Sequence, residues 1–417
     1  MQRLHTTKYA KLILAVLVVL LVGAVGAKLY FTGHAATPTV SLEAEAGAVT
    51  GNALKVADTT ASGGNMVQFG ITKAGFSAGV VDNCGGVGSS TCTAAGYAVQ
   101  AQLWHDAGIT SVRTWLGCNV DALTRWNKDL KYYVAQGIQP ILVVACGQTY
   151  ASVQASGFAT WYGPFVKTMA GLGVHNYEFG NEMNGNTQWH TTDTSDALCG
   201  ANQAQATDYA AHVLDYVNWL HQGYTLAHAN DANANVISGG VEYSTTWQFC
   251  IVPSKTWITE MAKDGADRYM DSFGYHPYSP ATKTPAGAVA ASVSALQTDN
   301  YDAIKAGLGI VDSVPVRPVW ITEVGLCLST QTCAQNGRIS VTSDTDRANV
   351  MKSLYDGLKG AGAAGPVDWY WDAGDGYGIE SGGTAAGCSF GTTTLGATYT
   401  GHVLTPTLCA IKAYFKP

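Results

Sequence analysis

Two glutamates that close apolar segments are the residues of this chain best suited to chemistry. Glu182 ends the run "YEFGNE", and Glu323 ends the run "RPVWITE". Burying a carboxylate without a partner costs several kcal/mol, so two such residues at strand ends require a function or a partner. Two carboxylates that face each other can protonate a leaving oxygen and attack the carbon that carries it, which is the chemistry of glycoside hydrolysis.

Further polar side chains stand at the ends of other apolar segments. They are Arg113, Asn181, Glu242, His276, Tyr278 and Asp372. Taken alone, His276 has an ordinary interpretation as a core histidine, and Glu242 as a solvated loop residue. The chemical interpretation therefore requires a fold that gathers the ends of many strands in one place.

The segments that carry these residues alternate between two patterns. Short runs rich in β-branched and aromatic residues predict strands at 67–76, 109–116, 139–146, 174–182, 235–243, 271–278, 317–325 and 367–374. Segments with helical periodicity lie between or after them, at 97–108, 120–137, 159–173, 206–229, 345–362 and 407–415. Eight strand–helix units predict an α/β fold, a (β/α)8 TIM barrel over residues 67–417, whose active site lies at the carboxyl ends of the strands. A doubly wound sheet is the alternative, but no glycine-rich phosphate loop follows the first strand.

Five short motifs occur on the predicted strands in a fixed order. They are "RTW" on the second strand, "GNE" on the fourth, "HPY" on the sixth, "WITEVG" on the seventh and "DWYWDAG" on the eighth. Together they resemble glycoside hydrolase clan A over nearly the whole of residues 67–417, with a similarity to family 39 or family 5. The resemblance implies a catalytic domain that hydrolyses glycosidic bonds.

The same resemblance implies a role for each motif residue. Glu182 would be the general acid/base, Glu323 the nucleophile, and Asn181 would bind the 2-hydroxyl of the sugar. Arg113 and Tyr278 would flank Glu323 and keep it ionised, because a nearby cation and a donated hydrogen bond both lower the pKa of a carboxyl group. Enzymes of this clan retain the anomeric configuration, so a retaining mechanism is expected.

Aromatic side chains are the expected platforms for sugar rings. Trp371 is the first candidate for the subsite at the cleaved bond, and Trp115, Trp189, Trp247 and Tyr377 are candidates for outer subsites, although large aromatics more often fill a core. His276 in "HPY" is a further substrate-binding candidate. No cofactor or metal is expected, since Asp372 and Asp375 lack the spacing of a calcium loop.

Glu178 differs from the other glutamates, although it lies only four residues before Glu182. The two share strand parity and should point to the same side, with Glu178 one layer deeper. We therefore expect Glu178 to be a buried structural carboxylate, paired or protonated, with Arg113 on the neighbouring strand as a candidate partner.

Residues 1–33 have the pattern of an export sequence. Arg3, Lys8 and Lys11 precede an apolar run over 12–27, which residues up to 31 could extend. Cleavage after Ala27 or Ala35 and retention as a membrane tether through residues 12–31 both remain open. In either case the rest of the chain is expected outside the cell or at its surface.

Ten cysteines follow the export sequence, an even number that indicates disulfides outside the cytoplasm. Expected pairs are Cys84 with Cys92, Cys199 with Cys250, and Cys327 with Cys333. No CxxC or CxxH spacing occurs, which argues against a structural zinc site.

Residues 34–66 form a linker and a short β-rich segment. "EAE" and "ASGGNMVQFG" in this region resemble the opening of carbohydrate-binding β-sandwich modules, whose remainder is missing. Strands that decorate the next domain are the simpler interpretation. The net charge of −7 argues against a nucleic-acid partner.

These observations lead to one expected function with two alternatives. The chain is expected to be a monomeric, exported, retaining glycoside hydrolase for a β-linked polysaccharide or oligosaccharide such as a glucan, xylan or mannan. The alternatives are a catalytically inactive surface protein that binds sugar and a transglycosylase that remodels cell-wall glycan. In the clan, proline or tryptophan often follows the acid glutamate, whereas Met183 and Asn184 stand here, so the leaving-group subsite is the least defined part.

Overall fold

The computed structural model describes residues 53–57, 65–69, 75–82, 94–117, 120–145, 150–185, 209–245, 251–278, 284–328, 340–370 and 405–416. The chain divides into two compact units, residues 1–71 and 72–417. In the first unit, strands β1 (Ala53–Ala57) and β2 (Asn65–Phe69) form an antiparallel pair.

The second unit is a barrel of parallel strands. Its sheet runs in the order β7-β6-β5-β4-β3-β13-β10-β9-β8. The strands are β3 (Ser77–Asp82), β4 (Ile109–Leu116), β5 (Gln139–Val144), β6 (Asn176–Phe179), β7 (Asn235–Ser238), β8 (Val241–Glu242), β9 (Phe273–His276), β10 (Val319–Val324) and β13 (Ala363–Tyr370). Strands β7 and β8 are two pieces of one strand, separated only by Gly239 and Gly240, and they pair with β6 and β9 respectively. The sheet therefore closes into the predicted (β/α)8 barrel, with eight strand positions.

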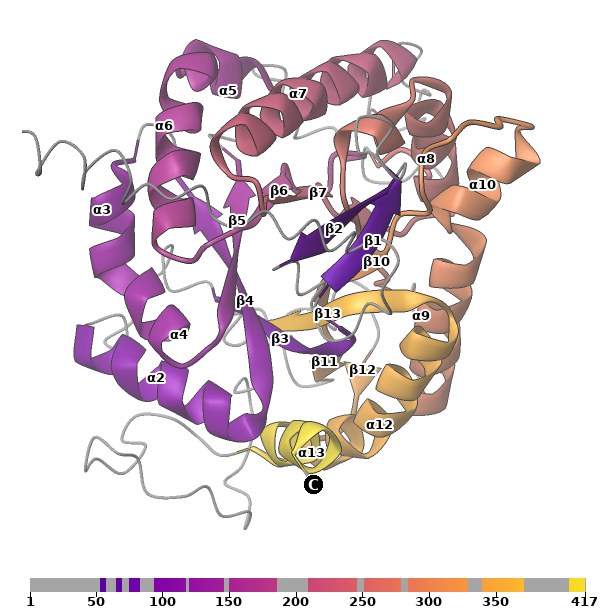
Figure 1. Cartoon of the computed structure of the whole chain (residues 1–417). Helices are drawn as coiled ribbons and strands as arrows, with labels where there is room; N and C mark the ends of the chain where they lie inside the picture. Colours follow the sequence, from indigo (N-terminus) through magenta and orange to yellow (C-terminus); the bar gives the residue numbers. More distant parts are fainter. Residues whose placement is uncertain are drawn as a thin grey trace, which may run out of the picture. The chain divides into compact units, whose positions relative to one another are not determined.

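Helices surround the barrel (Figure 1). They are α2 (Ala94–Ala107), α3 (Ala122–Arg125), α4 (Lys131–Ala135), α5 (Tyr150–Ala155), α6 (Phe158–Gly171), α7 (Tyr209–Asn230), α8 (Ser254–Lys263), α9 (Pro285–Thr298), α10 (Tyr301–Gly307), α12 (Asp344–Gly360) and α13 (Pro406–Phe415). The π-helix η2 (Trp126–Leu130) joins α3 to α4, the 3-10 helix η4 (Ala266–Tyr269) follows α8, and β11 (Cys327–Leu328) pairs with β12 (Ser340–Val341). Among the described helices, none combines the length and apolar character that crossing a membrane requires.

The first barrel strand lies later than predicted. The predicted segment 67–76 belongs partly to β2, and the barrel begins with β3. β3 was missed because its small residues Ala78 and Gly79 weaken the strand pattern. A residue without a side chain is needed at Gly79, since a Cβ there would lie 1.7 Å from Oδ1 of Asp368.

Two apolar clusters hold the barrel together. The larger one lies between strands and helices and contains the fully buried Trp104, Trp219, Trp257 and Trp369. A separate cluster consists of Ile141, Ile237 and Trp320. Ile237 is the register partner of Glu178 in the parallel sheet, so this small cluster packs on the same side of the sheet as the polar groups described next.

Several predicted features lie outside the described residues. These are the export sequence at 1–33 and, among the expected disulfide partners, Cys84, Cys92, Cys199, Cys250 and Cys333. Cys409 on α13 is disulfide-bonded.

Candidate active site

Arg113 on β4 is the centre of the polar network in the barrel. It is fully buried, and each of its three nitrogens donates to a different residue. Nε donates to Oε2 of Glu178 at 2.5 Å, Nη1 to Oε2 of Glu323 at 2.9 Å, and Nη2 to Oδ1 of Asn181 at 2.7 Å. Three residues from two other strand positions are thereby fixed to one guanidinium, whose rigid fork suits such convergent contacts.

Glu323 on β10 has both carboxylate oxygens engaged. Oε2 accepts from Arg113, and Oε1 accepts from the Tyr278 hydroxyl at 2.8 Å. Burial raises the pKa of Glu323 above its ordinary value, although the His276 ring, Arg113 and Tyr278 each act to lower it. Arg113 and Tyr278 thus lie where the sequence predicted, but their effect does not outweigh burial.

Glu182 occupies an unusual backbone conformation. Its φ is +49°, and among the described residues it is the non-glycine residue with positive φ. Its N–H donates to the Gly240 carbonyl at 2.8 Å, and its carbonyl accepts from Gly185 N–H at 2.7 Å. These two bonds hold a conformation that costs roughly 1–3 kcal/mol, and such strain is a common feature of functional positions.

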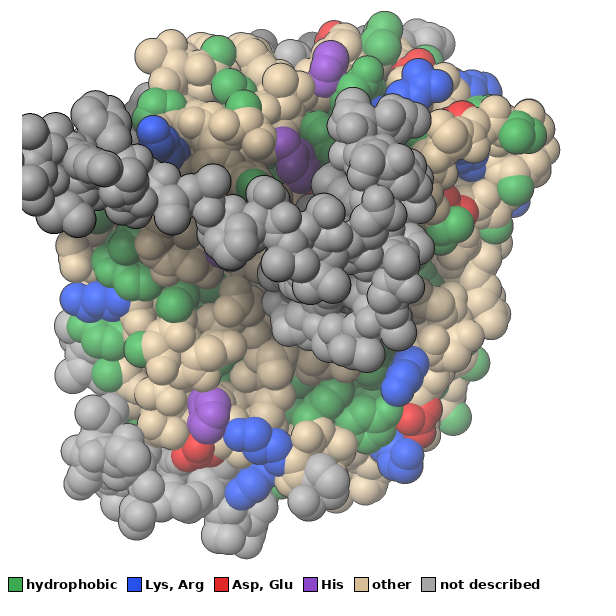
Figure 2. Space-filling view, in the orientation of Figure 1, with side chains coloured by type: hydrophobic (Ala, Val, Ile, Leu, Met, Phe, Trp, Pro, Cys, Tyr) green, Lys and Arg blue, Asp and Glu red, His purple; other side chains and the backbone are tan. Residues whose placement is uncertain are grey.

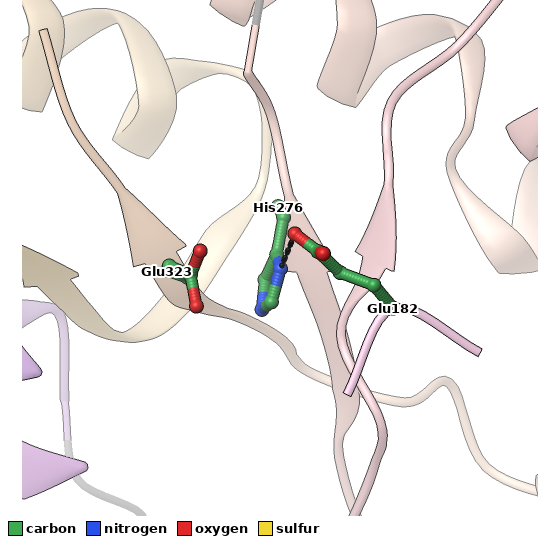
Figure 3. A group of neighbouring side chains, drawn as sticks. All are labelled: Glu182, His276 and Glu323. Carbon is green, nitrogen blue, oxygen red and sulfur yellow. Dashed lines mark hydrogen bonds and ion pairs between the residues drawn. The ribbon is translucent and has the colours of Figure 1, made fainter. Parts of the chain in front are cut away.

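The two candidate catalytic carboxylates face each other across His276 (Figure 3). One ligand atom from each of Glu182, His276 and Glu323 can be chosen so that all lie within 4.8 Å of one another. His276 Nδ1 is 3.2 Å from Oε1 of Glu182. At least one oxygen of Glu182 and one of Glu323 therefore lie within 4.8 Å of each other.

The same three side chains could in principle ligate a divalent cation. However, Arg113 and Tyr278 already donate to the two oxygens of Glu323. A metal ion at Glu323 would have to displace these donors and lie beside a buried guanidinium, at a high electrostatic cost. The donor set therefore does not fit a metal ion.

Glu178 on β6 lies in the layer beneath Glu182 and is fully buried. It accepts from Arg113, from Gly240 N–H at 2.9 Å and from the Thr322 hydroxyl at 2.9 Å. The prediction of a buried carboxylate paired with Arg113 is confirmed.

The two glycines that divide the fifth strand position make room for this network. A Cβ at Gly240 would lie 2.0 Å from Nε2 of His276, and a Cβ at Gly239 would lie 2.5 Å from the Phe179 carbonyl oxygen. Gly240 also contacts both glutamates. Its N–H donates to Glu178 on β6, and its carbonyl accepts from Glu182 N–H in the turn after β6. The geometry of the site therefore requires the two glycines at the break between β7 and β8.

The residues after Glu182 are structural. Met183 is buried, and Asn184 is fully buried. The Asn184 amide donates to the carbonyls of Glu242 and Val252 and accepts from Glu242 N–H at 3.0 Å. Asn184 therefore anchors the chain beyond β8 to the Glu182 turn.

The other sequence candidates have mixed outcomes. Trp115 on β4 is 37% exposed, and the Arg113 guanidinium carbon lies 5.6 Å from the centroid of its ring. Glu242 is buried rather than a solvated loop residue. Thr322 was missed, although a hydroxyl within the apolar run before Glu323 could have drawn attention to it. The remaining candidates lie outside the described residues: Trp189, Trp247, Trp371, Asp372, Asp375 and Tyr377.

No protein-family model and no curated protein matches the sequence. The structure is similar to that of a family 39 glycoside hydrolase from the gut symbiont Bacteroides cellulosilyticus WH2, with a TM-score of 0.50 and 17% identity over 87% of this chain and 69% of that chain. It is also similar to a family 39 β-xylosidase from Caulobacter crescentus, with a TM-score of 0.51 and 12% identity over 82% of this chain and 71% of that chain. The chain shares its fold with these two glycoside hydrolases. In this fold, the polar network described above occupies the ends of the barrel strands.

Proposed function

We propose that this chain is a retaining glycoside hydrolase in which Glu182 is the general acid/base and Glu323 the nucleophile. The observation that carries the proposal is the pair of facing carboxylates, held by different partners. Glu323 is fixed by Arg113 and Tyr278, whereas Glu182 contacts His276. The fold that the chain shares with two glycoside hydrolases supports the proposal.

The proposed reaction has two displacement steps. In the first, a carboxylate oxygen of Glu323 attacks the anomeric carbon while Glu182 transfers its proton to the glycosidic oxygen, so that the leaving sugar departs as an alcohol. In the second, Glu182 takes a proton from a water molecule, whose oxygen attacks the anomeric carbon and releases Glu323. Two inversions give net retention.

Asn181 is oriented for a contact with the sugar. Because Arg113 donates to its side-chain oxygen, the amide presents its NH2 group as a donor. A hydroxyl next to the anomeric centre is a suitable acceptor, and that contact strengthens as charge develops in the transition state.

The substrate proposed is a β-linked glycan, which Trp115 would bind as an exposed platform beside Arg113. Xylosides are the first class to test, because one structural relative is named a β-xylosidase. On the face shown in Figure 2, the Lys and Arg side chains lie in several separate places, which supports a partner other than nucleic acid. We further propose that the enzyme is monomeric and acts outside the cell or at its surface, as residues 1–33 suggest.

The decisive experiment compares four purified proteins on aryl β-glycosides, xylan, β-glucan and mannan. They are the wild type, Glu182→Gln, Glu323→Gln and the control Glu260→Gln on α8. Both active-site variants should lose activity by roughly 10²–10⁴-fold or more, while the control retains it. NMR of the first product should show the anomeric configuration of the substrate.

Four outcomes would count against the proposal. Activity that survives Glu323→Gln would remove the nucleophile assignment, and an inverted first product would remove the retaining mechanism. Binding of glycans without cleavage would favour the sugar-binding alternative, and products longer than the substrate would favour a transglycosylase.

A further inference from the structure

We infer that Glu178 and Thr322 act as positioning residues that fix the tautomer of His276, so that His276 and Glu182 together hold one shared proton. The catalytic consequence of this shared proton rests on the proposed function, but the position of the proton is a property of the folded chain. The inference follows from counting donors and acceptors along one chain of hydrogen bonds.

The count starts at Glu178, whose carboxylate receives three donors. Arg113 Nε and Gly240 N–H can only donate, and they contact Oε2 and Oε1 respectively. The third contact is the Thr322 hydroxyl, 2.9 Å from Oε1. Because Arg113 Nε and Gly240 N–H already donate to the two oxygens of Glu178, its carboxylate acts as an acceptor, and the single hydroxyl hydrogen of Thr322 points to it.

The next step is His276, whose Nε2 is 3.1 Å from Oγ1 of Thr322. The Thr322 hydrogen is already donated to Glu178, so Oγ1 offers only lone pairs to the ring. Nε2 must therefore carry a hydrogen. The ring is fully buried, and Gly240 packs directly against Nε2, which holds it in this orientation.

The remaining nitrogen, Nδ1, is 3.2 Å from Oε1 of Glu182. With Nε2 protonated, two arrangements satisfy this contact: a neutral ring that accepts from a carboxylic acid, or an imidazolium that donates to a carboxylate. Both contain one proton between the two residues. Removing that proton would leave a lone pair of Nδ1 facing a carboxylate oxygen, which is repulsive.

This arrangement serves both steps of the proposed reaction. In the first step, Glu182 must hold a proton, and the Nδ1 acceptor favours its acid form. After that proton has gone to the leaving oxygen, the carboxylate faces the lone pair of Nδ1 and becomes more basic. It then takes a proton from the attacking water, which restores the starting state. A histidine protonated on Nδ1 instead would donate to the carboxylate and favour its ionised form, so Glu182 would hold its proton less readily in the first step and be a weaker base in the second.

Other buried charged and titratable groups lie on the barrel strands around the pair. They are Arg113 on β4, Glu178 on β6, Glu242 on β8, Tyr278 after β9, Glu323 on β10 and Asp368 on β13. Substituting Thr322 changes none of these charges and leaves the contacts of Arg113 with Glu178 and Glu323 in place. Thr322→Val, which has nearly the same shape, is therefore the sharpest variant, and Thr322→Ser is its matched control.

The direct test is nitrogen-15 NMR of the His276 ring in the full chain, assigned by comparison with His276→Asn. In the wild type and Thr322→Ser, Nε2 should carry a hydrogen across the pH range in which the protein is folded. In Thr322→Val, the population with a hydrogen on Nδ1 and none on Nε2 should increase. A wild-type ring without a hydrogen on Nε2 would overturn the inference. The wild-type spectrum therefore tests the tautomer even if Thr322→Val fails to fold.

The catalytic test is the basic limb of the pH profile of kcat/KM. In Thr322→Val this limb should move to lower pH by roughly one unit, the size expected for exchanging one hydrogen bond, and Thr322→Ser should restore it. An unchanged limb in an active Thr322→Val enzyme would contradict the inference. If Glu182→Gln and Glu323→Gln show that no glycosidase activity exists, the proposed function fails, and the NMR result still decides the tautomer.

Discussion

Two buried arginine–carboxylate clusters in this barrel invite comparison. Arg113 lies in the barrel with Glu178 and Glu323, and Arg125 on α3 forms an ion pair with Asp129 on η2 at 2.8 Å. Both arginines are almost completely removed from solvent. Only the first cluster has the arrangement expected of a reactive site, so burial of charge alone does not mark function.

The clusters differ in how completely their polar atoms are paired. All three nitrogens of Arg113 donate at 2.9 Å or less. Among the described residues, by contrast, Arg125 Nε, Asp129 Oδ1 and the Tyr97 hydroxyl are buried without a hydrogen-bond partner. A preorganised site requires the first kind of network, because partly satisfied polar groups leave several geometries close in energy.

Raised pKa values do not separate the two clusters either. Burial raises the pKa of Asp129 to about 6 despite the Arg125 cation, and burial also raises the pKa of Glu323. A second carboxylate, Asp82, also contributes to the raised pKa of Asp129, but Asp82 accepts from the Tyr133 hydroxyl. What distinguishes Glu323 is that Glu182 faces it across His276, with one atom from each of the three side chains within 4.8 Å of the others. A perturbed carboxyl group thus indicates function only together with such a partner.

The comparison is tested most strongly by Arg113→Met beside Arg125→Met. Removing one partner of a buried ion pair costs about 3–5 kcal/mol, so urea unfolding should show both variants to be destabilised. Activity per folded molecule should fall by about 10³-fold or more in Arg113→Met, because Glu323 and Asn181 lose their common anchor. In Arg125→Met it should stay within about threefold. Equal losses of activity would show that the two clusters are not different in kind.

The sequence could predict the first cluster because strand parity and strand ends locate it. Arg113, Glu178 and Glu323 each interrupt an apolar run, and a closed barrel brings such interruptions together. The second cluster could not be predicted. Arg125 and Asp129 are four residues apart on a helical segment, which is the ordinary pattern of a solvent-exposed pair. Their burial results from tertiary packing beside Tyr97 and Tyr133, which no local pattern records.

Some elements of the fold could likewise be predicted from the sequence, and others could not. Long amphipathic helices such as α6 and α12 were recognised, whereas α9 was not, since its alanine-rich sequence has no charged face. Thr284 caps α9, and Pro285 follows at its first position, so its start was marked by the residues that favour a helix N-terminus. The strand prediction at 235–243 did not show that its two glycines divide the strand into β7 and β8, or that Gly240 makes room for His276.

The second prediction concerns Gly240, with Gly171 at the end of α6 as its control. Gly240→Ala places a Cβ against His276, and overpacking of this kind costs about 1–3 kcal/mol. Because His276 and Glu182 would both shift, kcat should fall by roughly 10²-fold. Nothing lies within 4 Å of a Cβ at Gly171, so Gly171→Ala should leave activity unchanged. An active Gly240→Ala enzyme would mean that the barrel adjusts more easily than its geometry suggests.

The third prediction uses the second cluster. The pKa of Asp129 rises on folding from 3.8 to about 6, so the folded state binds a proton that the unfolded chain has lost between these values. The stability from this group is therefore full below pH 3.8 and is lost as pH rises through about 6, a change of about 2–3 kcal/mol. Urea unfolding from pH 4 to 7 should show that the free energy of unfolding of Asp129→Asn rises relative to that of the wild type as the pH increases. The same pH dependence of the free energy of unfolding in both proteins would contradict this prediction.

The smallest expected effect is on the acidic limb of the pH profile. Glu323 must be ionised to attack, and burial raises its pKa above the ordinary 4.5, so kcat/KM should fall below a pH that lies above 4.5. The Tyr278 hydroxyl lowers that pKa, and a hydrogen bond to a charged group contributes about 1.5 kcal/mol. Tyr278→Phe should therefore move the acidic limb upward by roughly one unit, while Asp129→Asn and Tyr132→Phe leave it in place. If Asp129→Asn moved the limb as far as Tyr278→Phe does, the raised pKa of a distant buried carboxyl would be part of catalysis, and the two clusters would have to be treated as one.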